Sequence, residues 1–185
     1  MESESRATAE VDAGGRLDVV IGLGANIGSP ELALRRAAAE LSTWGFGARS
    51  SRLYRTFPVG GPPQPDFLNA ALRFSYAGSP RSLLERLRAV EAGAGRVRRE
   101  RWGPRPLDLD ILWASGVVVN EPDLIVPHAR LRERAFALRP LLDVAPTAID
   151  PRDGVAYARV LAEIGSAGVE LRDAAWADMF SEGFT

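Results

Sequence analysis

Short apolar runs alternate with segments rich in Gly, Pro and Ser along most of the chain. Apolar or alternating runs predict strands at residues 17–23, 48–56, 67–77 and 107–113. A Ser-Pro pair at residues 29–30 and another at 79–80 read as an N-cap followed by Pro at the first helical position. Apolar residues recur at helical spacing after each pair, so we predict helices that extend to residues 44 and 92.

The chain is less regular outside these elements. Residues 58–65 hold four Pro and two Gly, which excludes a regular element there. We expect residues 117–119 to form a hairpin with the strand at 107–113, and residues 122–127 to be irregular. Helical segments are predicted within residues 130–142 and over 155–164, and the last twenty residues are only weakly patterned.

The predicted order of elements is β-α-β-β-α-β with additions, which is the ferredoxin-like α+β pattern of helices packed on one core sheet. A length of 185 residues suits one domain. We expect residues 1–16 to be a disordered N-terminal tail, because they carry acids and small polar residues and no apolar core. Residues 17–164 are expected to form the functional domain, and residues 165–185 a C-terminal extension.

Composition excludes several kinds of chemistry. All 23 basic residues are Arg, the chain has no Lys and no Cys, and its only histidine is His128. P-loop, Schiff-base, cysteine-nucleophile and thiolate-zinc mechanisms are therefore excluded. A metal site would have to use carboxylates and other oxygen ligands, which favours Mg²⁺. The net charge of −1 argues against broad nucleic-acid binding.

Asp108 and Asp110 are the strongest chemical signal. Alternate residues of a strand point to the same face, roughly 6.5–7 Å apart along the chain, so two carboxylates there repel each other unless a cation neutralises them. This spacing suits one or two Mg²⁺ ions. Arginines beside such a pair are typical of a site for a Mg²⁺-bridged polyphosphate, and five of them precede it: Arg96, Arg98, Arg99, Arg101 and Arg105.

Aromatic and polar residues near these groups could hold a flat heterocycle. Trp102 lies inside the Arg-rich loop, and Phe67 and Asn69 share a strand face. His128 could be a general base, a phosphate ligand or a structural donor, with Arg134 and Phe136 close behind it. Core packing for Phe67 and a structural role for His128 remain open alternatives. We interpret GLGANIG at residues 22–28 as a tight strand-to-helix turn and not as a dinucleotide fingerprint, because its third Gly is one position late.

Five stretches together resemble the 6-hydroxymethyl-7,8-dihydropterin pyrophosphokinase family of folate biosynthesis. They are IGLGANIGSP, SRLYRTFPVG, QPDFLNAAL, GRVRRERWGPRPLDLDIL and VPHARLRERAFALRPLLDVAP, and they cover residues 19–146 in order and spacing. The resemblance implies a ferredoxin-like core with long, mobile active-site loops, and makes residues 17–164 a pyrophosphokinase domain. It also implies transfer of the diphosphoryl group of ATP to the pterin hydroxymethyl oxygen, with release of AMP.

The resemblance also assigns residues. It implies that Asp108 and Asp110 hold two Mg²⁺ ions and act as catalytic residues together with Arg96 and Arg105. The ATP site would comprise Glu91, Arg98, Trp102, Arg105, Ile111, His128 and Arg134. The pterin site would comprise Thr56, Pro58, Val59, Phe67, Asn69, Trp102 and Phe136, with the two phenylalanines on either side of the ring.

Two other functions remain possible from the residues alone. A noncatalytic nucleic-acid-binding module would explain the Arg-rich loop and Trp102, but not the paired aspartates. Another Mg²⁺-dependent nucleotide phosphotransferase would need the aspartates, but not Phe67, Asn69 and Phe136 together. The expected partners are ATP and the pterin, without nucleic acid or membrane. We expect a cytoplasmic location, because no segment resembles a signal peptide or a transmembrane helix. We also expect a monomer.

Overall fold

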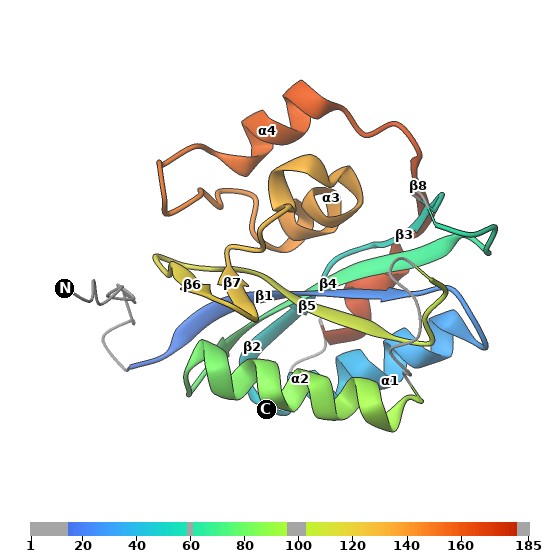
Figure 1. The fold of residues 1–185 in the computed structure, drawn as a ribbon, viewed down its shortest axis with the longest axis horizontal. Coiled ribbons are helices and arrows are strands. Elements are labelled where there is room, and N and C mark those ends of the chain that lie inside the picture. Colours follow the sequence, from blue (N-terminus) through green and yellow to red (C-terminus); the bar gives the residue numbers. More distant parts are fainter. Residues whose placement is uncertain (1–14, 59–60, 96–102, 181–185) are drawn as a thin grey trace.

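A computed structural model describes residues 15–58, 61–95 and 103–180 (Figure 1). The elements in chain order are β1 (Leu17–Ala25), α1 (Pro30–Ser42), β2 (Gly45–Ser50), β3 (Leu53–Thr56), β4 (Phe67–Tyr76), α2 (Pro80–Gly93), β5 (Asp108–Ala114), β6 (Val119–Glu121), β7 (Leu124–Val126), the 3-10 helix η1 (Leu131–Glu133), α3 (Ala135–Val144), α4 (Tyr157–Ile164), β8 (Val169–Asp173) and the 3-10 helix η2 (Ala175–Phe180). The order β-α-β-β-α-β predicted for the core is present when β2 and β3 are counted as one divided strand.

The main sheet is antiparallel and has the strand order β5-β1-β4-β3-β8, with β2 also paired to β4. Helices α1 and α2 cover one face, and α3 and α4 cover the other (Figure 1). The small hairpin of β6 and β7 lies beside β5. The strand that carries Asp108 and Asp110 is therefore at one edge of the path, and β8 is at the other.

Each face of the sheet has its own apolar core. Leu34 and Leu41 of α1 and Leu83 and Leu87 of α2 are fully buried against one face. On the other face, α3 and α4 bury a second set of side chains, including Leu138. This division follows from the alternation of side chains along each strand, since both sets of positions are apolar over most of the sheet. The N-terminal half of β5 breaks this pattern, because Asp108 and Asp110 occupy the second face.

The single strand expected at residues 48–56 is divided into β2 and β3. At the break, the Ser51 N–H donates to the Ala71 carbonyl (2.8 Å), and the Ala71 N–H donates to Ser51 Oγ (2.8 Å). The Ser51 hydroxyl thus takes the place of a backbone acceptor, and the chain bends there while both halves stay paired to β4. The alternating pattern continued through this break and gave no sign of it.

Two predictions for this region are wrong. Residues 117–119 form no hairpin with residues 107–113, and residues 122–127 are not irregular throughout, because they contain β7. β6 pairs with β7, and Glu121 lies opposite Leu124. Pro122 and Asp123 form the two-residue connection, which Pro favours at its first position. β5 pairs with β1 on one side, and after β5 the Ser115 N–H donates to the Asp18 carbonyl of β1.

The two Ser-Pro pairs do begin helices. The Ser79 hydroxyl accepts the Ser82 N–H (3.1 Å), whereas Ser29 precedes α1 without a side-chain cap bond. The expected helical pieces after residue 130 are η1 and α3, and α4 occupies the segment predicted over 155–164. Among the described residues, no helix combines the length and the apolar composition that a membrane crossing requires.

Candidate active site

A row of residues crosses the second sheet face from one strand to the next. Asn69 on β4 lies opposite Gly24 on β1, and Gly24 lies opposite Asp108 on β5. Asp110 lies opposite Gly22, two residues further along the same face. The two carboxylates predicted to share a face do so, and the register brings the carboxamide of Asn69 into their row.

A cavity of about 550 Å³ opens over this row, and we call it the site cavity. Its volume suits a small-molecule site. Ten of the predicted site residues line it: Thr56, Pro58, Phe67, Asn69, Arg105, Asp108, Asp110, His128, Arg134 and Phe136. They come from β3 and the residues after it, from β4, from β5 and the residues before it, and from the segment before and at the start of α3. The fold thus gathers motifs from widely separated parts of the sequence.

Gly24 forms part of the cavity floor, although the sequence indicated only a tight turn near it. A Cβ at this position would lie 3.2 Å from Asn69 Oδ1 and 3.9 Å from Asp108 Cβ. The Asn69 side chain is held on its other side, where its amide nitrogen donates to Thr56 Oγ1 (2.7 Å). Both Asn69 and Thr56 are buried, so the floor has a fixed shape.

The metal-binding candidates lie among basic groups. Arg105 Nη1 is 2.7 Å from Asp108 Oδ2, and Asp110 Oδ2 is 3.9 Å from His128 Nε2. The described residues bring together no group of three or more acidic, His or Cys side chains that could hold a metal by themselves. Two carboxylates nevertheless fit Mg²⁺, because this ion is usually held by one or two carboxylates, substrate phosphates and water.

The surroundings of His128 make its Nε2 a hydrogen-bond donor in the folded protein. Burial, and then the charge of Arg134, lower its pKa to about 4, so the ring is neutral at physiological pH. Its Nδ1 accepts the Arg130 N–H (3.1 Å), which leaves the ring proton on Nε2. Arg134 Nη1 is 3.4 Å from that nitrogen, and burial also lowers the pKa of Arg134. Two donors thus converge on one place, which favours an anion such as a phosphate oxygen.

Asn26 connects the loops at the border of the site cavity. Its side-chain oxygen accepts the Arg105 N–H (2.7 Å), and its own N–H donates to the Arg105 carbonyl (3.0 Å). Its amide nitrogen donates to Gln64 Oε1 (2.9 Å) and to the Pro65 carbonyl (3.0 Å). One buried side chain directly after β1 thus fixes the chain on both sides of the cavity, although no pattern around it in the sequence singles it out.

Two predicted ATP-site residues do not line the site cavity. Glu91 is buried on α2, and its carboxylate accepts the Leu109 N–H (2.8 Å) from the strand between the two aspartates. Ile111 packs into the core on the other face of β5. The remaining predicted site residues lie outside the described ranges: Val59, Arg96, Arg98 and Trp102.

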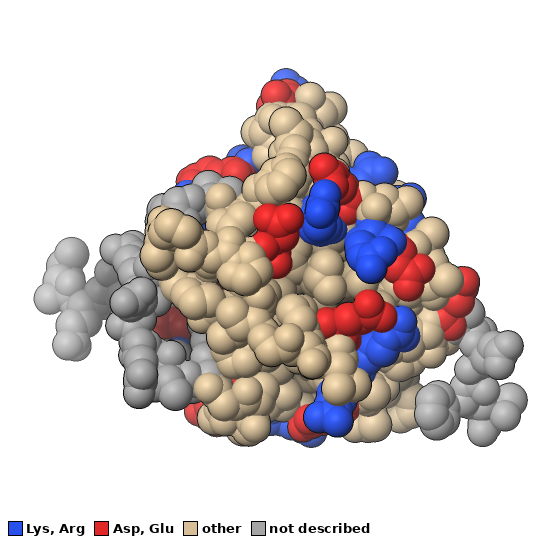
Figure 2. All heavy atoms as spheres, turned by 90° about the vertical axis from the view of Figure 1, so that its right-hand side faces the viewer, with Lys and Arg blue, Asp and Glu red and all other residues tan. Residues whose placement is uncertain are grey.

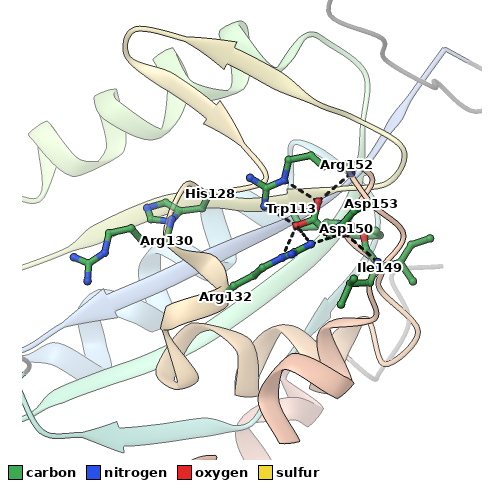
Figure 3. A network of polar contacts seen from close by, with 9 residues as sticks. Trp113, His128, Arg130, Arg132, Ile149, Asp150, Arg152 and Asp153 are labelled. Atoms are coloured by element: carbon green, nitrogen blue, oxygen red, sulfur yellow. Dashed lines mark hydrogen bonds and ion pairs between the residues drawn. The ribbon is translucent and has the colours of Figure 1, made fainter. Parts of the chain in front are cut away.

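A buried carboxylate, Asp150, holds the segment that carries His128, Arg130 and Arg132 (Figure 3). Arg132 points away from the site cavity and binds Asp150 (2.7 Å) and Asp153 (2.5 Å). Asp150 is fully buried and also receives the guanidinium of Arg152 (2.5 Å) and its backbone N–H (3.0 Å). Arg130 and Arg134 thus line the site cavity, whereas Arg132 between them binds the buried Asp150.

Figure 2 shows basic and acidic side chains next to one another on one face of the molecule, where the described residues form no extended basic strip. The described residues form many such pairs, among them Arg55–Glu170 (2.6 Å) and Arg35–Glu31 (3.0 Å). This interleaving agrees with the net charge of −1.

Comparison with known proteins decides the family. Residues 20–146 match the model of the family described as 7,8-dihydro-6-hydroxymethylpterin-pyrophosphokinase (HPPK). The chain belongs to the HPPK family. This membership confirms the expected enzyme class, an ATP-dependent pyrophosphokinase of folate synthesis, and identifies the reaction as transfer of pyrophosphate from ATP to hydroxymethyldihydropterin.

Individual relatives agree with this result. A 2-amino-4-hydroxy-6-hydroxymethyldihydropteridine pyrophosphokinase of Synechocystis is 38% identical over 152 residues, which cover 81% of this chain and 77% of that protein. A protein of the same name from Methylorubrum extorquens is 42% identical over 153 residues. The match covers 81% of this chain and 95% of that protein. A folate synthesis bifunctional protein of Arabidopsis thaliana is 44% identical over 78% of this chain, which spans 26% of that longer protein.

Solved HPPK structures have the same fold. An HPPK-DHPS triple mutant of Plasmodium falciparum superimposes with a TM-score of 0.65 at 13% sequence identity. The match covers 80% of this chain but only 41% of the solved chain, so this chain spans less than half of that bifunctional protein. The ferredoxin-like fold expected from the order of elements is confirmed.

Proposed function

We propose that the site cavity is where this HPPK-family enzyme binds ATP and 6-hydroxymethyl-7,8-dihydropterin, with the phosphates at β5 and the pterin over β4 and β3. The observation that carries the proposal is the single row of Asp108, Gly24 and Asn69 across three strands. It places a carboxylate suited to metal and phosphate beside a buried amide suited to a heterocycle. Gly24, which lies between them, has no side chain that would separate the two parts of the cavity.

The two Mg²⁺ ions that we propose would be held by Asp108 and Asp110, and charge balance at the site cavity supports added cations there. Three arginines and three acidic residues are found among its described lining residues, and His128 is neutral. These charges cancel, so the anionic polyphosphate of ATP would need further positive charge there. Mg²⁺ held by Asp108 and Asp110 would supply this charge by neutralising phosphate oxygens.

The protein's own groups then bind and orient the reactants. Arg105 is held by Asn26 and faces Asp108, where it can grip a phosphate through its planar guanidinium. His128 Nε2–H and Arg134 donate toward the same region, which suits the departing AMP phosphate or the transferred group. Phe67 and Phe136 provide two ring faces for the pterin, with Asn69 at its edge.

The chemical step we propose is an in-line attack of the pterin hydroxymethyl oxygen on the β-phosphorus of ATP. The bond from that phosphorus to the α-phosphate oxygen breaks, AMP leaves, and the hydroxyl proton passes to solvent or phosphate. Positioning and charge neutralisation lower the barrier, and no side chain forms a covalent intermediate. We also propose, as the sequence led us to expect, a cytoplasmic monomer that binds neither nucleic acid nor membranes.

The test is a product assay with paired variants. The wild-type protein with Mg²⁺, ATP and the dihydropterin should form AMP, and no AMP should form when the acceptor is omitted. Asp108→Ala and Asp110→Ala should each retain less than about a tenth of the rate, equal to at least about 1.4 kcal/mol in barrier. The control is Asp123→Ala, which removes an exposed carboxylate outside the site cavity. Near-normal AMP formation by either active-site variant would overturn the metal assignment.

A further inference from the structure

The chain after α4 returns to the sheet and extends it. α4 ends at Ile164 and is capped by Gly165, which has a φ of +74° and whose N–H donates to the Leu161 carbonyl. A second Gly at position 168 (φ +76°) turns the chain into β8, which pairs antiparallel with β3 (Figure 1). Both positions need a left-handed backbone that Gly adopts without strain. This segment lies beyond residues 20–146, which match the family model.

The turn before β8 is part of the wall of the site cavity. Ala167, Gly168 and Val169 all line it, next to Phe57 from the end of β3. A Cβ at Gly168 would lie 3.6 Å from Phe57 Cδ2, so the turn and the aromatic ring are neighbours. Ala167 is exposed and carries only a methyl group, so its side chain occupies little space at this part of the cavity wall.

Charge pairs attach β8 to the same border of the cavity. Arg55 of β3 lies opposite Glu170 of β8 and binds it at 2.6 Å. The same guanidinium is 3.7 Å from Asp66, in the segment that leads from the cavity border into β4. The position of β8 is thus connected to the loop that carries Gln64, another lining residue.

Strand order decides which end of the bound acceptor this turn faces. Asp108 and Asp110 lie on β5, and the path runs from β5 through β1, β4 and β3 to β8. With neighbouring strands about 4.8 Å apart, β8 is roughly 19 Å from the carboxylates. On the proposed function, the hydroxymethyl group of the acceptor must point to the phosphates at β5. The opposite edge of the pterin, which carries the 2-amino and 4-oxo groups, must therefore point toward β3 and β8.

We propose that the turn at residues 167–169 closes the acceptor end of the site cavity and limits the size of the ring that fits there, with Ala167 as the residue that sets this limit. The inference rests on the proposed function and adds to it a segment outside the family match. The small side chains at residues 167 and 168 leave space for the edge of a two-ring heterocycle. A larger side chain there would occupy the space of the acceptor, far from the ATP phosphates.

The test is a size series at one position. Ala167→Val, Ala167→Leu and Ala167→Trp are compared with Ala162→Trp, which adds the same bulk on the exposed surface of α4. Dissociation constants are measured separately for the dihydropterin, in the presence of a nonhydrolysable ATP analogue and Mg²⁺, and for the analogue alone. We expect acceptor binding to weaken stepwise, by at least tenfold for Ala167→Trp, while analogue binding changes by less than twofold. Ala162→Trp should match the wild type.

The outcomes separate this inference from the proposed function. Acceptor binding by Ala167→Trp within twofold of the wild type, or tighter, would overturn the role of the turn and leave the reaction intact. A wild-type protein that does not bind the acceptor at all would overturn the proposed function itself. Equal weakening of analogue and acceptor would also refute the inference, because it would show a general disturbance of the fold; circular dichroism spectra of all four variants check this directly.

Discussion

Replacing Asp150 by Asn tests how the phosphate-binding segment is held in place. The Asp150 carboxylate is fully buried and accepts charge-assisted hydrogen bonds from Arg132 and Arg152 (Figure 3). Arg132 lies in η1, between His128 and Arg134, both of which line the site cavity. Loss of the carboxylate should therefore destabilise the protein and also displace the two cavity-lining donors.

The magnitude follows from the pKa of Asp150. Burial alone would raise it, but hydrogen bonds and charge from Arg152 and Arg132 outweigh burial and lower it to about 2, from an ordinary value of 3.8. A difference of this size contributes about 2 kcal/mol to the free energy of unfolding. Because the folded-state pKa is depressed, this contribution is complete above the unfolded-state pKa and is lost as pH falls from about 4 through 2.

Urea unfolding followed by circular dichroism measures the effect. At pH 7, Asp150→Asn should lower the free energy of unfolding by about 2 kcal/mol, and the deficit should shrink as pH falls below about 4. Binding of an ATP analogue should weaken at least fivefold, with acceptor binding less affected. Glu163→Gln is the matched control, because Glu163 makes an exposed pair with Arg159 on α4. A loss below about 0.5 kcal/mol together with unchanged analogue binding would refute the reasoning.

Three further changes test the site itself. Gly24→Ala should weaken acceptor binding about tenfold by crowding Asn69 Oδ1, with unchanged binding of an ATP analogue, as calorimetric titration of each ligand would show. Without Mg²⁺ and nucleotide, the unfolded chain protonates His128 before the folded one, so the free energy of unfolding should fall by about 3 kcal/mol as pH decreases from 6.5 to 4. His128→Gln should remove this part of the pH dependence in urea unfolding. Arg105→Lys should lower kcat at least tenfold in steady-state assays, since Lys cannot reproduce the planar guanidinium fork that faces Asp108.

Local patterns predicted most of the core and the part of the site that lies on strands. Asp108 and Asp110, and likewise Phe67 and Asn69, share a face because side chains alternate along a strand, and this needs no knowledge of neighbours. Ser-Pro pairs marked the helix starts because Pro suits the first helical position. These features depend on residues close together in sequence, so a single sequence contains them.

Features that depend on distant partners could not be predicted in this way. Gly24 is part of the floor only because β4 and β5 pair on either side of it. Asn26 joins segments 38 and 79 residues away, and its own neighbours give no sign of this. The hairpin error at residues 117–119 has another cause, because β6 pairs with β7 across the two-residue connection of Pro122 and Asp123, which is local in the sequence. β8 had no clear pattern of its own and is ordered by pairing with β3.

The most direct test of the central claim is ³¹P NMR of the acceptor product. After incubation of the protein with Mg²⁺, ATP and 6-hydroxymethyl-7,8-dihydropterin, the account predicts AMP and a pterin diphosphate in equal amounts, the latter with two mutually coupled phosphorus signals. Formation of ADP and a pterin monophosphate, with a single uncoupled phosphorus on the pterin, would contradict it.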